Sequence, residues 1–208
     1  REELGLPKDG FVFCCFNNHY KITPDIFDIW MRILENIKGS VLWLSKGNQI
    51  SQINLKKEAD KRNISPDRIV FSERLSSLSD HLSRHKVADL FLDTLPYNAH
   101  STCSDALWSG LPVLTCAGNS FAARVAASML NAINLPELIT NSKKEYEEKA
   151  INFANNPQYI KKIKKKLAEN RLKAPLFNTD LYAKNIENIF HKIHLRHLNK
   201  LQPEHIEI

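Results

Sequence analysis

The sequence predicts an α/β fold in which a parallel, doubly wound sheet is covered by helices on both faces. Short apolar runs alternate along the chain with segments of helical periodicity, which is the pattern of βαβ units with right-handed crossovers. The apolar runs carry hydrophobic residues on both faces, as strands of a covered parallel sheet do. At 208 residues and 43% hydrophobic content, the chain is long enough for one large domain or for a compact domain with an added helical segment.

Five strands and five helices alternate in the first part of the chain. The expected strands are Phe11–Cys15, Val41–Leu44, Ile69–Phe71, Ala88–Leu92 and Pro112–Thr115. The expected helices are Pro24–Ile37, Ser51–Arg62, Leu78–His85, Asp105–Ser109 and Phe121–Leu130. Thr23 followed by Pro24 is an N-cap before a proline at the first helical position, and Gly39 and Gly110 stand where helices must end.

After Pro136 the pattern becomes helical throughout. The expected helices there are Lys143–Ala154, Pro157–Leu172 and Thr179–His194, with Pro175 interrupting the run. We therefore expect two parts, a Rossmann-like lobe over residues 1–140 and a C-terminal helical segment over residues 141–208 that packs on it.

The net charge of +6 is concentrated near the C-terminus. Residues 141–200 hold 14 Lys and Arg against 6 Asp and Glu, whereas residues 1–140 hold 15 of each. Such a block is compatible with nucleic-acid binding. However, Ile160, Ile163 and Leu167 interrupt the lysines of residues 161–166 at helical spacing. This favours the solvated sides of an amphipathic helix over a nucleic-acid patch.

The ends of the chain and its cysteines bear on where the protein works. The N-terminus has neither an initiator Met nor a signal-peptide pattern, so we expect a piece of a longer protein. No apolar run approaches membrane-spanning length. The four cysteines include no Cys-x-x-Cys pair, which argues against a disulfide scaffold or a zinc ribbon. We expect a cytoplasmic protein.

A polar loop follows the strand Ala88–Leu92 just before a helix begins. Ligands of open α/β sheets bind at the carboxyl ends of strands, and free N–H groups with a positive dipole at a helix start favour phosphate. His100, Ser101 and Thr102 are placed to complete such a cradle. Asp105 completes a capping box with Thr102 or points toward a ribose diol, and the sequence leaves these two roles about equal.

Other polar residues follow the first and third strands. Asn18, His19 and Lys21 leave the first strand, where a lysine would neutralise a phosphate; alternatively Lys21 is a surface lysine and the asparagines form a turn. Two polar loops at one edge of the sheet favour the functional reading. His81, at the start of the helix after the third strand, would cover a nucleobase or is simply a partly exposed surface group.

The sequence lacks several motifs that mark common classes of nucleotide-binding proteins, hydrolases and metal sites. The six glycines form neither G-x-G-x-x-G nor G-x-x-x-x-G-K, and there is no G-x-S-x-G elbow. The histidines show no paired pattern of metal ligands. These observations leave a site for a nucleotide-like diphosphate without a dedicated metal, with lysine and a helix terminus carrying the positive charge.

At these residues the chain resembles the C-terminal catalytic half of the O-linked N-acetylglucosamine transferase family, which includes the SPINDLY O-fucosyltransferases. The resemblance spans about residues 4–190. Its motifs are Gly10–Ile22, Ser40–Leu44, Ala88–Thr102, Asp105–Thr115, Arg124–Ser128 and Pro175–Thr179. It implies the nucleotide-sugar lobe of a two-lobed glycosyltransferase B fold. Two departures from the family are His-Ser-Thr in place of His-Thr-Thr at 100–102 and no lysine within residues 75–80.

The resemblance also implies residue roles. Lys21 would contact the diphosphate and stabilise the leaving UDP, with Asn18 beside it where the family often has glutamine. His81 would stack on uracil and Asp105 would bind the ribose hydroxyls. The phosphate oxygens would be held at the helix start by His100, Ser101 and Thr102.

The implied reaction is inverting transfer of N-acetylglucosamine from UDP-GlcNAc to a protein Ser or Thr hydroxyl, without a metal or other cofactor. The acceptor protein would bind N-terminal to this segment in such enzymes, so we expect the fragment alone to be catalytically incomplete. An O-fucosyltransferase, or another enzyme using a different nucleotide sugar, is the alternative. A third, noncatalytic hypothesis is a basic interaction module, although nucleic acid is not the favoured partner.

Overall fold

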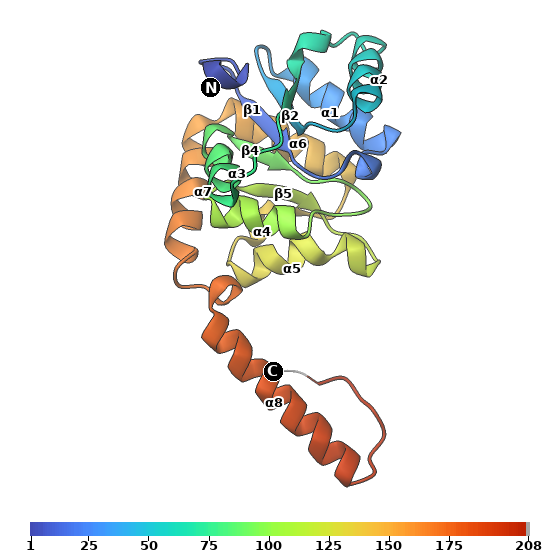
Figure 1. The fold of residues 1–208 in the computed structure, drawn as a ribbon, viewed down its shortest axis with the longest axis vertical. Helices are drawn as coiled ribbons and strands as arrows, with labels where there is room; N and C mark the ends of the chain where they lie inside the picture. Colours follow the sequence, from blue (N-terminus) through green and yellow to red (C-terminus); the bar gives the residue numbers. More distant parts are fainter. Residues whose placement is uncertain (207–208) are drawn as a thin grey trace.

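The computed structural model describes residues 1–206, and its centre is a six-stranded parallel sheet (Figure 1). The strands are β1 (Val12–Cys15), β2 (Val41–Ser45), β3 (Ile69–Ser72), β4 (Leu90–Leu92), β5 (Val113–Cys116) and β6 (Ile139–Thr140). Their order is β3-β2-β1-β4-β5-β6. The chain therefore winds outward from β1 in one direction and then, starting at β4, in the other.

The described residues form eight α-helices. They are α1 (Pro24–Asn36), α2 (Gln49–Asp60), α3 (Leu78–Arg84), α4 (Ser101–Trp108), α5 (Val125–Ala132), α6 (Lys143–Asn155), α7 (Pro157–Asn170) and α8 (Thr179–Leu198). Helix α1 packs against α6 on one face of the sheet, and α4 packs beside α3 and α5 on the other (Figure 1). The predicted doubly wound architecture is confirmed.

Three predicted features differ from the structure. Helix α4 begins at Ser101 rather than at Asp105, because the polar first turn carries no apolar periodicity from which its start can be read. A short 3-10 turn, Phe121–Ala123, precedes α5, which itself begins only at Val125. The two-residue strand β6 lies after Pro136, where the sequence predicts only helices, because two residues are too few to show a period.

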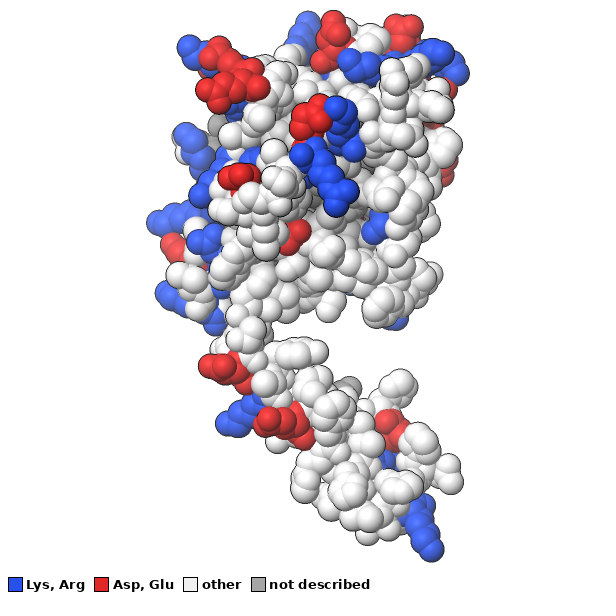
Figure 2. Space-filling view, in the orientation of Figure 1, with Lys and Arg blue, Asp and Glu red and all other residues white. Residues whose placement is uncertain are grey.

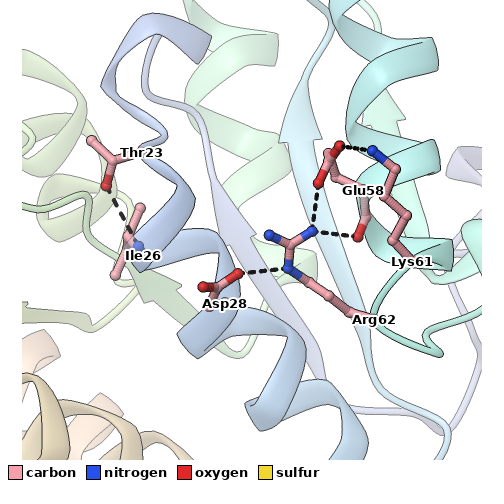
Figure 3. A network of polar contacts seen from close by, with 6 residues as sticks. All are labelled: Thr23, Ile26, Asp28, Glu58, Lys61 and Arg62. Carbon is pink, nitrogen blue, oxygen red and sulfur yellow. Dashed lines mark hydrogen bonds and ion pairs between the residues drawn. The ribbon is translucent and has the colours of Figure 1, made fainter.

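The ends of α1 and α2 are fixed by polar contacts that Figure 3 shows. The Thr23 hydroxyl caps α1 by accepting from the Ile26 N–H at 3.5 Å, as expected from the Thr-Pro pair. The Arg62 guanidinium, just after α2, donates to Asp28 on α1 at 2.6 Å and to Glu58 on α2 at 2.6 Å. Arg62 therefore ties the end of α2 to the neighbouring helix.

The C-terminal helices differ in how they relate to the core. Side chains of α6 and α7, including Tyr146, Phe153, Ile163 and Leu167, are buried in the same hydrophobic cluster as the sheet. Helix α8 has no buried residue and extends away from the body of the molecule (Figure 1). Helices α6 and α7 thus share the core of the preceding lobe. The division into two parts at residue 140 stays a prediction.

The basic block lies on α7, at the left edge of the molecule in Figure 2. Ile160, Ile163 and Leu167 are buried, which confirms the amphipathic helix. Lys164 donates to the Ala88 carbonyl at 3.0 Å, and Lys166 pairs with Glu137 at 2.7 Å. Part of the block is therefore engaged in holding α7 on the lobe.

The structure also shows the state of the cysteines and the character of the helices. Cys14, Cys15 and Cys103 are buried free thiols, and Cys116 is a partly buried one. Among residues 1–206, no helix combines the length and the apolar character needed to cross a bilayer.

The Tyr146 hydroxyl joins helices α6 and α1 to the loop after β4. It donates to the Asp93 carbonyl at 3.0 Å and accepts from the Trp30 indole N–H at 3.2 Å, and the side chain is fully buried. Replacing Tyr146 by Phe leaves both partners without this bond, and burying an unsatisfied polar group costs about 1–3 kcal/mol. We expect the free energy of unfolding of Tyr146→Phe to fall by about that amount in chemical denaturation.

The matched control is Tyr159→Phe on α7, where the ring is 36% exposed and water is available to the hydroxyl. Its unfolding free energy should change by less than about 0.5 kcal/mol. Equal losses in the two variants would show that the Tyr146 hydroxyl has no special role in the core.

Candidate functional site

The crevice is the carboxyl edge of the sheet between β1 and β4, where the strand order reverses. These two strands are neighbours in the sheet, and the chain leaves them toward opposite sides. Loops after such strands cannot cover one another, so they leave a gap at the carboxyl edge that ligands of doubly wound sheets occupy. The loop after β1 carries Asn17–Lys21, and the loop after β4 carries Asp93–His100.

Asp93 is the fully buried centre of the β4 loop. Its carboxylate accepts from the Thr94 N–H at 2.8 Å, the Ala99 N–H at 2.6 Å and the Thr115 hydroxyl at 2.6 Å. Burial raises the pKa of Asp93 to about 6, while these hydrogen bonds favour the charged form. The carboxylate thus closes the loop on itself and fastens it to β5.

Asn17 connects the β1 loop to the β4 loop and to α4. Its buried amide donates to the Thr94 hydroxyl at 2.7 Å and to Asp93 at 3.3 Å, and its amide oxygen accepts from the Thr102 hydroxyl. The Thr102 side chain therefore links α4 to the β1 loop instead of capping the helix as in the predicted capping box. Neither Asn17 nor Asp93 is among the site residues expected from the sequence.

Lys21 projects from the β1 loop onto the β4 loop. Its ammonium donates to the Asn98 carbonyl at 2.9 Å and lies 3.8 Å from the centre of the Tyr97 ring. Burial lowers the pKa of Lys21, and the charge of Asp93 opposes that shift. A cation is therefore held at the crevice by fixed partners, which the surface-lysine alternative did not anticipate.

The first turn of α4 faces the same crevice. His100 occupies the residue before the helix, and its ring lies 5.3 Å from that of Tyr97 and 6.1 Å from that of Phe121. Among the described residues, the buried Nε2 of His100 has no hydrogen-bond partner. Ser101 opens the helix with an exposed side chain, and N–H groups of a first helical turn lack intrahelical partners. This end of α4 is suited to an anion.

His81 and Asp105 meet across α3 and α4. The His81 Nε2 lies 3.4 Å from an Asp105 carboxylate oxygen, and Arg84 donates to His81 Nδ1 at 2.6 Å. Because arginine only donates, this contact assigns the proton of the neutral ring to Nε2, facing Asp105. Burial and the charge of Arg84 lower the pKa of His81, and Asp105 opposes them. The Asp105 carboxylate thus turns outward to His81.

A hollow of about 710 Å³ opens beside the β1 loop. Its lining includes Asn18, Tyr20, Lys46 and Thr102. The Asn18 side chain is exposed and accepts from the Tyr20 N–H at 3.4 Å, so the predicted turn role is present. His19 also lines this hollow, and its ring nitrogens are bonded to the Ser45 carbonyl and the Ser51 hydroxyl.

The predicted residues therefore fall into three adjoining groups. Asn18 and Thr102 line the hollow, Lys21 and His100 both contact Tyr97, and His81 pairs with Asp105. Ser101 stands at the start of the helix that carries Thr102 and Asp105. Among residues 1–206, no group of three or more His, Cys, Asp or Glu is arranged to hold a metal ion. The arrangement offers a cation and a helix terminus for an anion, next to a neutral imidazole and a carboxylate.

Comparison with known proteins gives matches over nearly the whole chain. Residues 1–186 match the model of Glycosyl transferase family 41. The chain is 37% identical, over its whole length, to the probable UDP-N-acetylglucosamine–peptide N-acetylglucosaminyltransferase SEC of Arabidopsis thaliana, and covers 21% of that protein. It is 34% identical over 99% of its length to the UDP-N-acetylglucosamine–peptide N-acetylglucosaminyltransferase of Caenorhabditis elegans, covering 18% of it. The chain thus spans about a fifth of these relatives.

Solved structures match the fold. A Thermobaculum terrenum O-GlcNAc transferase superimposes with a TM-score of 0.83 at 23% identity, over 91% of this chain and 39% of that one. A sucrose-phosphate synthase from Thermosynechococcus elongatus has a TM-score of 0.66 at 15% identity, over 94% of this chain and 48% of that one. These likenesses confirm the predicted glycosyltransferase B architecture.

The buried Asp93 makes stability depend on pH in a defined direction. Its folded pKa, about 6, lies above the ordinary value of 3.8, so its contribution is fully present below pH 4 and is lost as pH rises through 6. Asp93→Asn keeps the shape without the titration. We expect the unfolding free energy of the native protein, relative to Asp93→Asn, to fall by on the order of 2–3 kcal/mol between pH 4 and 7.

Denaturation at a series of pH values measures this difference. Asp60→Asn, which changes an exposed carboxylate at the end of α2 and keeps Asp93, is the control, and its unfolding free energy should follow that of the native protein over the same range. A difference between the native protein and Asp93→Asn that stays constant from pH 4 to 7 would contradict the raised pKa.

Arg84 should govern the titration of His81. Replacing it by Met removes the neighbouring cation and the bond to Nδ1, so the pKa of His81 should rise, as followed by NMR of the imidazole resonances. Arg74→Met changes an exposed arginine in the preceding loop and should leave that titration in place. An unchanged His81 pKa in Arg84→Met would show that Arg84 does not set the state of the ring.

Proposed function

This chain belongs to glycosyl transferase family 41, and we propose that it is the nucleotide-sugar-binding half of a protein O-GlcNAc transferase. The reaction is inverting transfer of N-acetylglucosamine from UDP-GlcNAc to a Ser or Thr hydroxyl of a protein. The observation that carries the proposal is the meeting of the Lys21 ammonium and the start of α4 at the β1–β4 crevice.

The diphosphate of the donor binds between these two positive features. Lys21 neutralises its charge, while the Ser101 hydroxyl, the first N–H groups of α4, including that of Thr102, and the unpartnered nitrogen of His100 supply hydrogen-bonding groups. Asn18 borders the same space. The Thr102 hydroxyl donates its proton to Asn17, so Thr102 offers the phosphate its backbone N–H rather than its hydroxyl.

The nucleoside lies toward α3. The neutral His81 ring stacks on the base without the cost of burying a charge, and Asp105 exchanges its contact with His81 for the ribose hydroxyls. Both residues lie on helices whose ends surround the crevice, so the base, ribose and diphosphate follow one line from α3 to the start of α4.

Bond breaking places negative charge on the departing UDP. The acceptor oxygen forms a bond to the anomeric carbon from the opposite side, the bond from that carbon to the diphosphate oxygen breaks, and its electron pair stays on UDP. Lys21 and the α4 terminus stabilise this developing charge more than the neutral bond it replaces, which is how they accelerate the step. The acceptor proton leaves to a group outside this chain.

The acceptor site, the role of a metal and the compartment are further parts of the proposed function. Because it spans about a fifth of its relatives, we propose that the acceptor protein binds to a region N-terminal to it and that the isolated chain does not complete the transfer. We also propose that the enzyme works without a metal, since Lys21 and α4 supply the charge that a metal would otherwise supply, and that it acts in the cytoplasm.

Binding of UDP tests the site. Calorimetry with the native protein should show saturable binding, and Lys21→Ala should weaken it about 10- to 100-fold, because a charged hydrogen bond to phosphate contributes about 1.5–3 kcal/mol. The control is Lys57→Ala, an exposed lysine on α2. Absence of UDP binding by a folded sample, or equal affinities for Lys21→Ala and the native protein, would contradict the assignment.

The donor sugar is tested by substrate competition. The proposed contacts are to the diphosphate, the ribose and the base, and none is to the sugar that is transferred. A stacked imidazole also accepts more than one base. GDP-fucose is therefore the alternative donor. Hydrolysis of UDP-GlcNAc and of GDP-fucose by the full-length protein separates the two, and preference for the former supports an O-GlcNAc transferase. Retention of DNA that is lost on neutralising the α7 lysines would instead favour the noncatalytic module.

A further inference from the structure

Tyr97 is the aromatic residue around which the charged side of the crevice is organised. Its ring lies 3.8 Å from the Lys21 ammonium, 5.3 Å from the His100 ring and 6.2 Å from the Tyr20 ring, all measured to its centre. It is 40% exposed, so it borders the open space as well as the lysine. No role in the site was expected for Tyr97 from the sequence.

The loop that bears Tyr97 is held from several sides. The Tyr97 carbonyl accepts from the Thr94 hydroxyl at 2.6 Å. The next residue, Asn98, donates its N–H to Ala122 at 2.9 Å and its amide to the Thr94 carbonyl at 3.0 Å. Asp93 closes the loop beneath. The ring is therefore presented by a fixed backbone rather than by a free surface loop.

Lys21 needs such a partner because it is partly removed from water. Burial lowers its pKa, which means that the charged form has lost hydration at this place. The negative face of an aromatic ring attracts an ammonium group and replaces part of that hydration. One N–H of the ammonium goes to the Asn98 carbonyl, and the ring takes another.

We propose that Tyr97 is a positioning residue that fixes the Lys21 ammonium by a cation–π contact, so that its remaining N–H is directed to the donor diphosphate. The inference rests on the proposed function, since it assigns Tyr97 an effect only through Lys21. The ring face, and not the phenol hydroxyl, does the positioning.

The test is a double-mutant cycle measured as UDP affinity with the full chain. Tyr97→Leu keeps an apolar side chain but removes the ring face, and should weaken UDP binding roughly 3- to 10-fold, the range of a partly exposed cation–π contact. Tyr97→Phe keeps the ring and should restore most of the affinity. In a Lys21→Met background, Tyr97→Leu should cause no further loss.

Uridine separates positioning of the lysine from general damage to the loop. It lacks the diphosphate, so its binding, followed by NMR titration, should be the same in Tyr97→Leu and the native protein. Tyr182→Leu on α8, where the ring is 68% exposed and far along the chain from the crevice, is the matched control for UDP.

Three results would overturn the proposal. Equal UDP affinities of Tyr97→Leu and the native protein would show that the contact does not contribute to UDP binding. A loss of UDP affinity in Tyr97→Phe as large as that in Tyr97→Leu would assign the effect to the hydroxyl. A further loss in the Lys21→Met background would show that Tyr97 acts independently of the lysine. Failure of the proposed function is distinguished by absence of UDP binding in the native protein itself.

Discussion

One buried carboxylate underlies the geometry of the crevice. Asp93 ends β4, and its oxygens gather two backbone N–H groups of its own loop, the Thr115 hydroxyl of β5 and the Asn17 amide of the β1 loop. A charge in this position is costly to bury, and each of these donors offsets part of that cost. The carboxylate therefore draws the β1 loop, the β4 loop and β5 to a single point.

The consequences extend outward through the residues that Asp93 holds. Asn17 transmits the constraint to Thr102 and so to the first turn of α4, while the closed β4 loop presents Tyr97 and Asn98 to Lys21. On the far side, Tyr146 binds the Asp93 carbonyl and connects the loop to α1 and α6. The positive groups of the crevice are therefore parts of one hydrogen-bonded assembly.

The sequence was informative where periodicity and position suffice. Alternating strands and helices, and polar residues at the ends of β1 and β4, predicted the sheet and brought Lys21 and His100 to one edge, because parallel strands end on the same side. The sequence does not show which polar side chains are buried and which partners they bind. Asn17 and Asn18 are adjacent asparagines, but only Asn17 is buried and joins two loops, whereas Asn18 makes only a local bond to Tyr20. Thr102 has the sequence pattern of a cap, but its hydroxyl donates to Asn17 instead. The Tyr97–Lys21 contact joins distant loops, and no local pattern records it.

Helix α8 lies outside the hydrogen-bonded assembly around Asp93 and has no buried side chain over Thr179–Leu198. Its backbone hydrogen bonds depend on the helix itself, and an isolated helix of this length opens often in water. Amide protons there should exchange with deuterium far sooner than those of the central strands. Within a single exchange experiment, α8 would thus serve as an internal reference, against which slower exchange at the β1 and β4 loops on adding a nucleotide reports binding rather than a change in solution conditions.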